Sequence, residues 1–379
     1  MNPRRVTIIQ ERLPDYRILF FQKLRNRLKQ HQIELELLYS PDISDDLAMS
    51  ELSWATSIHS RRVRSLTWQP VLRRCWYSDL VIVPQLTRYP ASILLQFLRG
   101  LTARKHAFWG HGSNSKPSSV LRLAEALKRT ISVRADWWFA YNDLAARVVA
   151  GLGYPENRIT SVMNAIDTSG IRQRREQLSA AEIEAARREL GIMSRNVAIF
   201  TGSLRDFKRP EFLVAACEKI REQVPDFEMI VIGDGEYAEI MVDAVARWSW
   251  FHYLGRKNDM DKVPYWALSK LSLMPGGVGL VALDSLALGV PMVTTANRFH
   301  GPEIDYLKDG INGVMVQAGD DPACYAAEVV ALLRDDERCA AMAANALADC
   351  DLYSCEDMCQ RFTDGILSVL AAPRYRLCL

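Results

Sequence analysis

The sequence predicts an α/β fold built from two doubly wound, Rossmann-like domains. Strand-like and helix-like segments alternate along most of the chain, which is typical of parallel sheets. The alternation stops once, in the polar helical stretch 167–196, and then restarts. At 379 residues the chain is also too long for one ordinary core. We therefore expect a first domain at 1–168 and a second at 169–354, with a helical tail at about 355–379.

The elements of the first domain follow from apolar runs and helical periodicity. Short apolar runs predict strands at 4–10, 33–40, 79–85, 106–110, 136–142 and 158–166. Helical patterns between them predict helices at 16–32, 91–104, 118–135 and 143–153. Residues 42–76 are rich in Ser, Arg and Trp, and we expect them to be irregular.

The second domain repeats the same alternation. Strands are predicted at 197–203, 227–235, 250–256, 271–275, 290–296 and 313–319. Helices are predicted at 209–224, 236–248, 261–270 and 280–289, and the chain is expected to stay helical after 321. Ligands of such sheets bind beyond the carboxyl ends of the strands, so two sheets facing each other predict a site between the domains.

Composition excludes several classes of protein. Hydrophobic residues make up 49% of the chain and charged residues 24%, as in ordinary globular proteins. The formal net charge of +2 is too small for a nucleic-acid-binding field. No apolar run approaches the roughly 20 residues of a membrane helix, and the run at 6–9 is too short for a signal peptide. We therefore expect a cytoplasmic protein. Eight cysteines without a C-x-x-C pair and six unclustered histidines predict no metal site.

The turn "FTGSLRDFKRPEFL" joins a buried strand to a helix in the second domain. Gly202 ends the strand, and Ser203, Arg205 and Lys208 lie before the helix. Amides at a helix N-terminus attract phosphate, and nearby cations reinforce this attraction. The alternative is an ordinary turn with solvated basic residues. A second turn, "VIGDGEYAEI", is interpreted as structural, with Asp234 as an N-cap or, alternatively, a ligand of a hydroxyl group. The D-x-D pattern of Asp259 and Asp261 is also interpreted as structural, with Asp261 as a helix cap.

The stretch "MPGGVGLVALDSLALGVPMVTT" holds a third turn of this kind. Gly276, Gly277 and Gly279 supply backbone that a ligand can approach without interference from Cβ atoms. A helix is predicted to begin near Leu280, which places Asp284 about one turn into it. A carboxylate there can accept two hydrogen bonds from a vicinal diol such as a ribose.

The first domain carries one candidate histidine and several basic stripes. His111 lies between two glycines just past a strand, where it can contact a substrate hydroxyl or a developing charge; a surface-loop histidine is the alternative. The basic residues lie beside apolar ones, which indicates either solvated helix faces or a patch that binds anionic lipid. They are Lys23, Arg25, Arg27, Lys29, Arg61, Arg62, Arg64, Arg73, Arg74, Arg122, Lys128, Arg129 and Arg134, with Trp68 and Trp76 among them.

Taken together, these segments resemble the retaining glycosyltransferases of family 4, which have the GT-B fold. "TGSLRDFKRPEFLVAA" resembles the family segment G-R-L-x-x-x-K-G, and "VIGDGEYAEI" resembles I-G-D-G-P. "MPGGVGLVALDSLALGVPMVTT" resembles P-S-x-x-E-G-F-G-L-x-x-L-E-A-x-A-x-G-x-P-V-V, and "GPEIDYLKDGINGVMV" resembles the close of that pattern. The matches cover most of residues 196–318. The first domain matches more loosely, through "WGHG", "ADWWFAYN" and "VMNAIDT".

The resemblance implies a nucleotide-sugar donor, with a UDP- or GDP-sugar as substrate and no cofactor or metal. Lys208, Ser203 and Arg205 would hold the diphosphate, and Gly255 and Arg256 would meet the base. Asp284 matches the second glutamate of the family's pair, the ribose ligand, whereas Gly276 stands where the first glutamate would be. The full donor set implied is Gly202, Ser203, Arg205, Lys208, Gly255, Arg256, Gly276, Gly277, Val278, Gly279, Leu280 and Asp284.

On the acceptor side, we expect Tyr16 and Arg17 to contact the acceptor because they follow the first strand. The resemblance adds Trp109 and His111. Catalysis would rest on His111, Lys208 and Asp284, and the tail would cross back to the first domain. We expect a retaining, metal-independent glycosyltransferase that acts on a glycan or lipid-linked saccharide in bacterial exopolysaccharide or envelope assembly, with peripheral attachment to the cytoplasmic membrane. A GT-B nucleotide-sugar epimerase and a non-catalytic nucleotide-sugar binding protein remain as alternatives.

Overall fold

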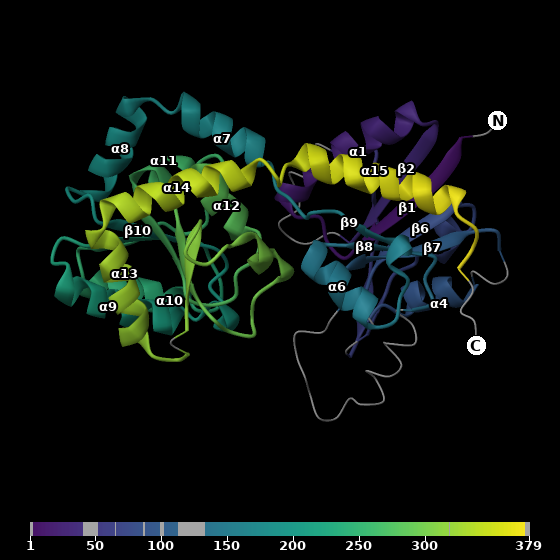
Figure 1. Cartoon of the computed structure of the whole chain (residues 1–379). Coiled ribbons are helices and arrows are strands. Elements are labelled where there is room, and N and C mark those ends of the chain that lie inside the picture. Colours follow the sequence, from purple (N-terminus) through teal and green to yellow (C-terminus); the bar gives the residue numbers. More distant parts are fainter. Residues whose placement is uncertain are drawn as a thin grey trace. The chain divides into compact units, whose positions relative to one another are not determined.

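The computed structural model describes residues 3–40, 52–64, 66–85, 88–98, 102–112, 133–317 and 319–375. The chain divides into two compact units (Figure 1). Unit 1 comprises residues 1–166 and 355–379, and unit 2 comprises residues 167–354. Within the described residues, no helix is long and apolar enough to cross a membrane.

Unit 1 contains a parallel sheet with the strand order β3-β2-β1-β6-β7-β8-β9. The strands are β1 (Arg4–Gln10), β2 (Ile33–Tyr39), β3 (Thr56–Ser57), β6 (Leu80–Pro84), β7 (Lys105–Gly110), β8 (Trp137–Ala140) and β9 (Ile159–Ser161). The helices beside it are α1 (Ile18–Gln30), α3 (Leu72–Cys75), α4 (Pro90–Leu98), α6 (Asp143–Gly151) and α15 (Cys355–Ala371), with short 3-10 turns η1 (Asp15–Arg17) and η3 (Glu156–Arg158). Strand β6 is apolar and buried because helices cover both faces of a parallel sheet.

The segment expected to be irregular contains regular structure. Strands β4 (Arg61–Val63) and β5 (Leu66–Trp68) form a separate antiparallel hairpin. The sequence signal was weak because each strand has only three residues and most of its side chains are exposed, so no apolar run marks it. Most of the predicted helix at 118–135, with Arg122, Lys128 and Arg129, lies outside the described residues.

The last helix, α15, packs into unit 1 beside α1 (Figure 1). The Phe362 ring stacks on Phe139 of β8 with centroids 4.4 Å apart, and meets Trp109 edge-on at 4.9 Å. Gly365 allows this approach, because a Cβ atom there would lie 2.6 Å from the Phe139 ring and 2.8 Å from Thr160 Oγ1. The C-terminal helix therefore completes the core of unit 1, whose other elements come from residues 1–166.

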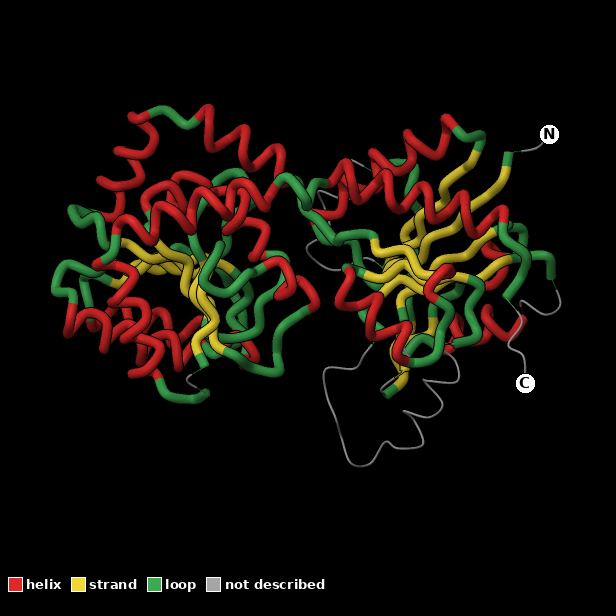
Figure 2. The backbone as a smooth tube through the Cα atoms, in the orientation of Figure 1, coloured by secondary structure: helices red, strands yellow, loops and turns green. Residues whose placement is uncertain are grey.

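Unit 2 contains a second parallel sheet with the order β12-β11-β10-β13-β14-β15. Figure 2 shows the strands of the sheets in yellow, with helices in red around them. Its strands are β10 (Val197–Thr201), β11 (Glu228–Ile232), β12 (Phe251–Tyr253), β13 (Leu271–Met274), β14 (Met292–Thr295) and β15 (Gly313–Val316). The chain winds outward from β10 to β12 and then returns to β13 on the other side of β10. This reversal is a topological switch point, where ligands of doubly wound sheets bind.

Helices cover both faces of the second sheet (Figure 1). One layer holds α9 (Pro210–Gln223), α10 (Ala238–Arg247) and α13 (Pro322–Arg334). The other holds α7 (Thr168–Gln177), α8 (Ala180–Leu190), α11 (Val263–Leu268), α12 (Val281–Leu288) and α14 (Asp336–Cys350). Two 3-10 turns, η4 (Asp206–Lys208) and η5 (Pro302–Tyr306), lie in loops that follow strands. The core between these layers includes Phe200, Leu273 and Tyr325, all fully buried.

Candidate nucleotide-sugar site

Unit 2 contains a cavity of about 550 Å³ beyond the carboxyl ends of β10, β11 and β12. Its volume falls in the range of small-molecule sites. Its lining includes four cationic side chains and two carboxylates, so the wall is polar and carries a net positive charge. The lining residues are Thr201, Gly202, Ser203, Lys208, Ile232, Gly233, Asp234, Gly235, Arg256, Lys257, Lys262, Val281 and Asp284.

Two glycine turns form one side of the cavity by packing backbone against backbone. Gly202 N donates to Ile232 O at 3.0 Å, and Leu204 N donates to Asp234 O at 2.8 Å. Gly233 has a φ of +157°, and a Cβ atom there would lie only 1.8 Å from Gly202 O. Only glycine fits this approach. The turn after β11 has a structural role, because it pairs with the turn after β10. It is also part of the cavity wall.

Lys208 is the most deeply buried cation of the cavity wall apart from Lys262, with 8% of its surface exposed. Its Nζ donates to Gly277 O at 2.5 Å. Burial lowers the pKa of Lys208 to about 8, against the opposing effect of Glu303. An ammonium with so little solvent is a strong site for an anionic group, because the interaction is weakly screened.

The loop after β13 uses its glycines to approach another part of the protein. A Cβ atom on Gly276 would lie 2.3 Å from the carbonyl carbon of Lys208. Gly277 N donates to Phe207 O at 2.7 Å, and Val278 N donates to His300 Nδ1 at 3.0 Å. These amides are therefore occupied by contacts with η4 and with the loop after β14. With this backbone, the position that carries glutamate in the family has no room for any side chain.

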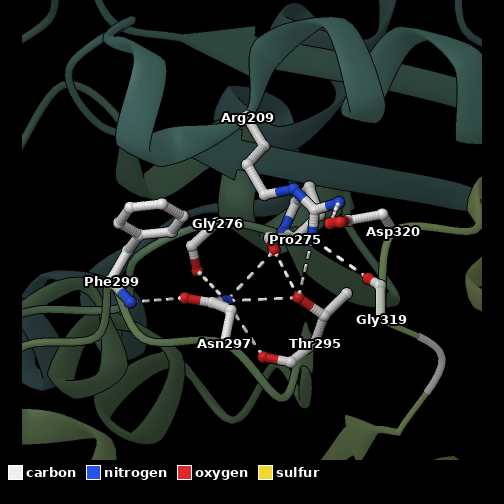
Figure 3. A network of polar contacts seen from close by, with 8 residues as sticks. All are labelled: Arg209, Pro275, Gly276, Thr295, Asn297, Phe299, Gly319 and Asp320. Carbon is white, nitrogen blue, oxygen red and sulfur yellow. Dashed lines mark hydrogen bonds and ion pairs between the residues drawn. The ribbon is translucent and has the colours of Figure 1, made fainter.

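A network of polar contacts holds the same loop from below (Figure 3). Thr295 Oγ1 at the end of β14 donates to Pro275 O at 2.7 Å, and Asn297 Nδ2 lies 3.4 Å from Gly276 O. Arg209 Nη1 donates to Thr295 Oγ1 at 3.1 Å, and its Nη2 pairs with Asp320 at 2.8 Å. The start of α9, the end of β14 and the loop after β13 are thus fixed to one another.

Asp284 lies in the first turn of α12 and is 5% exposed. Its Oδ2 accepts a hydrogen bond from Lys262 Nζ at 3.0 Å, and Lys262 also pairs with Asp259 at 2.8 Å. Burial raises the pKa of Asp284 to about 6, although Lys262 opposes the shift. Burial would lower the pKa of Lys262, but the carboxylates of Asp284 and Asp259 raise it above its usual value. Both groups are therefore charged at neutral pH.

The predicted donor residues fall into two groups. Those that line the cavity are Gly202, Ser203, Lys208, Arg256 and Asp284. Those that do not line it are Arg205, Gly255, Gly276, Gly277, Val278, Gly279 and Leu280. Arg205 is exposed, and Gly255 O accepts from Gly233 N at 2.9 Å, which joins the turns after β11 and β12.

Sequence reasoning missed several lining residues, above all Lys262 and Lys257. Asp234, which the sequence offered either as an N-cap or as a hydroxyl ligand, lines the cavity. Lys262 directly precedes α11, and nothing in its sequence surroundings separates it from an ordinary helix-start lysine. Asp261, expected as the cap of that helix, instead accepts a hydrogen bond from Asn258 Nδ2 at 2.6 Å. No group of metal-ligating side chains occurs in the part of the chain that the structure describes.

The predicted acceptor residues belong to unit 1. Tyr16 is 38% exposed, and His111 is exposed at the end of β7 with its ring 4.5 Å from the Tyr141 ring. Arg17 and Trp109 are only 5% and 4% exposed. The Arg17 guanidinium lies over the Trp109 ring at 5.0 Å and donates to Asn164. This placement favours a packing role over the predicted acceptor contact for these two residues.

Comparison with protein families finds a match within the second unit. Residues 195–335 match the family described as "Glycosyl transferases group 1". The matched segment lies entirely within unit 2. The chain is also 27% identical over 288 residues to D-inositol 3-phosphate glycosyltransferase from Corynebacterium urealyticum, an alignment that covers 72% of this chain and 65% of that protein. The resemblance to family 4 glycosyltransferases is confirmed. The chain spans about two fifths to two thirds of the length of the curated relatives it matches.

Solved structures confirm the GT-B fold. Anabaena HepE in complex with UDP superposes with a TM-score of 0.76 at 15% identity, over 96% of this chain and all of that one. The complex of the same protein with UDP-glucose gives a TM-score of 0.74 at 16% identity, over 96% and 99% of the two chains. UDP-GlcNAc 2-epimerase from Neisseria meningitidis, bound to UDP-GlcNAc, gives 0.68 at 15% identity, over 96% and 100%.

Proposed function

We propose that this protein is a retaining, metal-independent glycosyltransferase that uses a nucleoside-diphosphate sugar. The observation that carries the proposal is the cavity at the switch point of unit 2, where a buried cation, Lys208, and a buried carboxylate, Asp284, line the same wall. A diphosphate needs the first group, and a ribose diol can use the second. Charged side chains at a solvated turn would bind a diphosphate only weakly, since ion pairs at exposed positions contribute little.

The chemistry we propose needs no protein nucleophile. The bond between the anomeric carbon and the leaving phosphate oxygen breaks, and the acceptor oxygen forms its bond on the same face. The leaving phosphate oxygen takes the proton of the acceptor hydroxyl. Lys208 would stabilise the negative charge that develops on the diphosphate, and His111 would contact the transferred sugar. The cations of the cavity wall would take over the charge compensation that a metal ion supplies elsewhere.

A UDP-sugar is the donor that the comparisons favour, because the HepE structures contain UDP and UDP-glucose. The sugar itself would be held differently from the family pattern, since Gly276 carries no carboxylate and has no space for one. We therefore expect a donor preference that differs from that of enzymes with glutamate at this position.

For the acceptor, we propose a glycan or lipid-linked saccharide of bacterial exopolysaccharide or envelope assembly, met at the cytoplasmic face of the membrane. The β4–β5 hairpin supports this proposal. Val63, Leu66 and Trp68 are 67%, 48% and 41% exposed, and Arg61 and Arg62 are exposed beside them. Exposed aromatic and apolar side chains among arginines suit an interface with anionic lipid.

A donor panel tests the function. The protein is incubated with UDP- and GDP-sugars, and thermal shift, slow donor hydrolysis and transfer to extracted lipid acceptors are measured. We expect stabilisation by one nucleotide and slow release of its sugar. An epimer formed from donor alone would assign the protein to the epimerase class, which the Neisseria neighbour represents. Binding without turnover on any acceptor would leave a nucleotide-sugar binding protein.

A further inference from the structure

The ion pair between Lys262 and Asp284 has a feature that an ordinary buried salt bridge lacks. Lys262 occupies Oδ2 of Asp284, whereas the buried Oδ1 has no hydrogen-bond partner within the described part of the chain. A buried acceptor without a partner is costly, by roughly 1–3 kcal/mol. Since Asp284 lines the cavity, a bound hydroxyl is a natural partner for that oxygen.

Lys262 is also held by a second carboxylate. Its Nζ also pairs with Asp259 at 2.8 Å, and Lys262 is itself 7% exposed. It directly precedes α11, which packs against α12, so the ammonium bridges the loop after β12 and the first turn of α12. A lysine fixed at two points orients the carboxylate that it contacts.

We propose that Lys262 is a positioning residue that fixes one oxygen of the Asp284 carboxylate, keeps it anionic and presents the other oxygen to the vicinal hydroxyls of a bound ribose. The inference rests on the proposed nucleotide-sugar site. It adds a residue to that site that no pattern in the sequence had indicated. Lys262 acts through Asp284 and does not touch the ribose.

The electrostatics of the site agree with this role. Burial raises the pKa of Asp284 to about 6 even with Lys262 beside it. Without the ammonium, desolvation and the negative charge of Asp259 would both raise the pKa of Asp284, and the carboxyl would hold its proton at neutral pH. A protonated Asp284 cannot accept two hydrogen bonds from a diol as well as the carboxylate can.

Other charged groups lie near Asp284, and a pH experiment must separate their titration from that of Asp284. Those facing the same cavity are Lys208, Asp234, Arg256 and Lys257. The elements packed against α12 also carry titratable side chains. They are Arg172, Arg174, Arg175 and Glu176 on α7, Tyr265 on α11, Asp336, Glu337, Arg338, Cys339, Asp349 and Cys350 on α14, and Glu303, Asp305 and Tyr306 on η5. Of all these and Asp259, only Asp259 joins Lys262 in shifting the pKa of Asp284.

The test compares UDP with 2′-deoxy-UDP, because the two ligands share their phosphates and base. Dissociation constants are measured by calorimetry on the full chain from pH 5 to 8. For the unchanged protein we expect UDP to bind at least tenfold more tightly at pH 7.5. That preference should fade as the pH falls through about 6, where Asp284 takes up a proton. Titration of the phosphates cancels in the ratio.

Three variants then test whether the preference for UDP and its pH dependence arise from Lys262 and Asp284. Lys262→Met should reduce the preference for UDP to less than threefold at pH 7.5 and move its pH midpoint above 7. Lys262→Arg should restore both, and Asp284→Asn should lose the pH dependence. Lys257→Met is the matched control, because Lys257 lines the same cavity without contacting Asp284; its loss should weaken both ligands by the same factor.

The outcomes separate this inference from the function that it rests on. Equal weakening of both nucleotides in Lys262→Met, with the preference for UDP intact, would overturn the positioning role and leave the donor site standing. A preference that does not vary with pH in the unchanged protein would overturn the positioning role too, and that measurement requires no variant to fold. An unchanged protein that binds no nucleoside diphosphate at all would overturn the proposed function as well.

Discussion

At the scale of single residues, Lys208 gives the site a pH dependence of its own. Burial lowers its pKa to about 8, so the free protein loses this positive charge as the pH rises through that value. A bound diphosphate favours the ammonium, so binding must take up a proton above pH 8. We expect the dissociation constant for UDP to rise by up to about tenfold per pH unit between pH 8 and 9.5.

Calorimetry over that range in two buffers of different ionisation enthalpy would measure the affinity and the proton uptake together. Lys208→Ala should bind UDP at least tenfold more weakly at pH 7.5 and show a nearly flat profile above it. An alanine variant with unchanged affinity would mean that the diphosphate lies elsewhere in the cavity.

Gly276 is a second residue whose identity has a local cause. Its Cβ position lies 2.3 Å from the Lys208 backbone, and backbone cannot move away as a flexible side chain can. Gly276→Ala should therefore lower the stability of unit 2 by about 1–3 kcal/mol, the usual effect of overpacking. Gly279→Ala is the control in the same loop, because nothing lies within 4 Å of its Cβ position. Thermal unfolding of both variants measures the difference, and equal melting temperatures would contradict the close approach.

At the scale of elements, His300 makes the stability of the loop after β13 depend on pH. Its Nδ1 accepts from Val278 N at 3.0 Å, while its Nε2 donates to Thr295 O at 2.9 Å, so the ring is neutral. Burial lowers the pKa of His300 below its usual value of about 6.5. The folded state therefore binds fewer protons than the unfolded state. The stability contributed by His300 is present above pH 6.5 and is lost as the pH falls through the folded-state pKa.

His300→Asn tests this sign, because asparagine keeps an acceptor but does not titrate. We expect the unfolding free energy of the unchanged protein to fall by about 1 kcal/mol more than that of the variant between pH 7 and 5. Chemical denaturation at several pH values gives both curves. Parallel curves would show that the loop does not depend on a neutral imidazole.

The β4–β5 hairpin is the element on which the membrane proposal depends. Reversing two of its charges, Arg61→Glu with Arg62→Glu, should lower the partition onto vesicles with anionic lipid at least tenfold, since each arginine contributes about 1 kcal/mol. Arg188→Glu with Arg247→Glu is the control, because these arginines are also exposed but lie on helices of unit 2. Sedimentation with vesicles of pure neutral lipid and of mixed anionic lipid measures both pairs. Equal losses would indicate a nonspecific effect of net charge.

At the scale of the whole molecule, the periodic parts of the chain were predictable. Buried parallel strands such as β6 and β10 are continuous apolar runs, and the polar break at 167–196 marks the helical stretch that opens unit 2. The hairpin was missed because its side chains face solvent and leave no apolar pattern. Buried strands leave a run of apolar residues in the sequence, whereas an exposed hairpin leaves no such run.

The site was predictable only where one turn carries several of its residues. Ser203 and Lys208 come from such a turn and line the cavity. Lys262 joins it through a contact with Asp284, 22 positions away, which no local pattern encodes. The glycines after β13 were predicted to meet a ligand, and Gly276 instead meets the Lys208 backbone. A glycine in the sequence indicates that other atoms lie close to the backbone. It does not indicate whether those atoms belong to a ligand or to another part of the protein.

The division into two units predicts that damage to one leaves the ligand site of the other intact. All residues that line the cavity belong to unit 2, whereas α15 packs into unit 1 through Gly365. Gly365→Val would force a branched side chain into Phe139 and Thr160, so we expect it to destabilise unit 1 by more than about 2 kcal/mol. Ser368→Val places the same residue on the exposed side of the helix and controls for helix propensity.

Calorimetric scans with and without UDP separate the two effects. In Gly365→Val the transition of unit 1 should move to lower temperature, and the transition that UDP stabilises should stay where it is. Saturation at about 100 times the dissociation constant should still add about 2.7 kcal/mol to unit 2. A loss of UDP affinity in this variant would mean that the donor site needs unit 1 to form, because a cavity built by unit 2 alone has no reason to respond to a clash between α15 and β8.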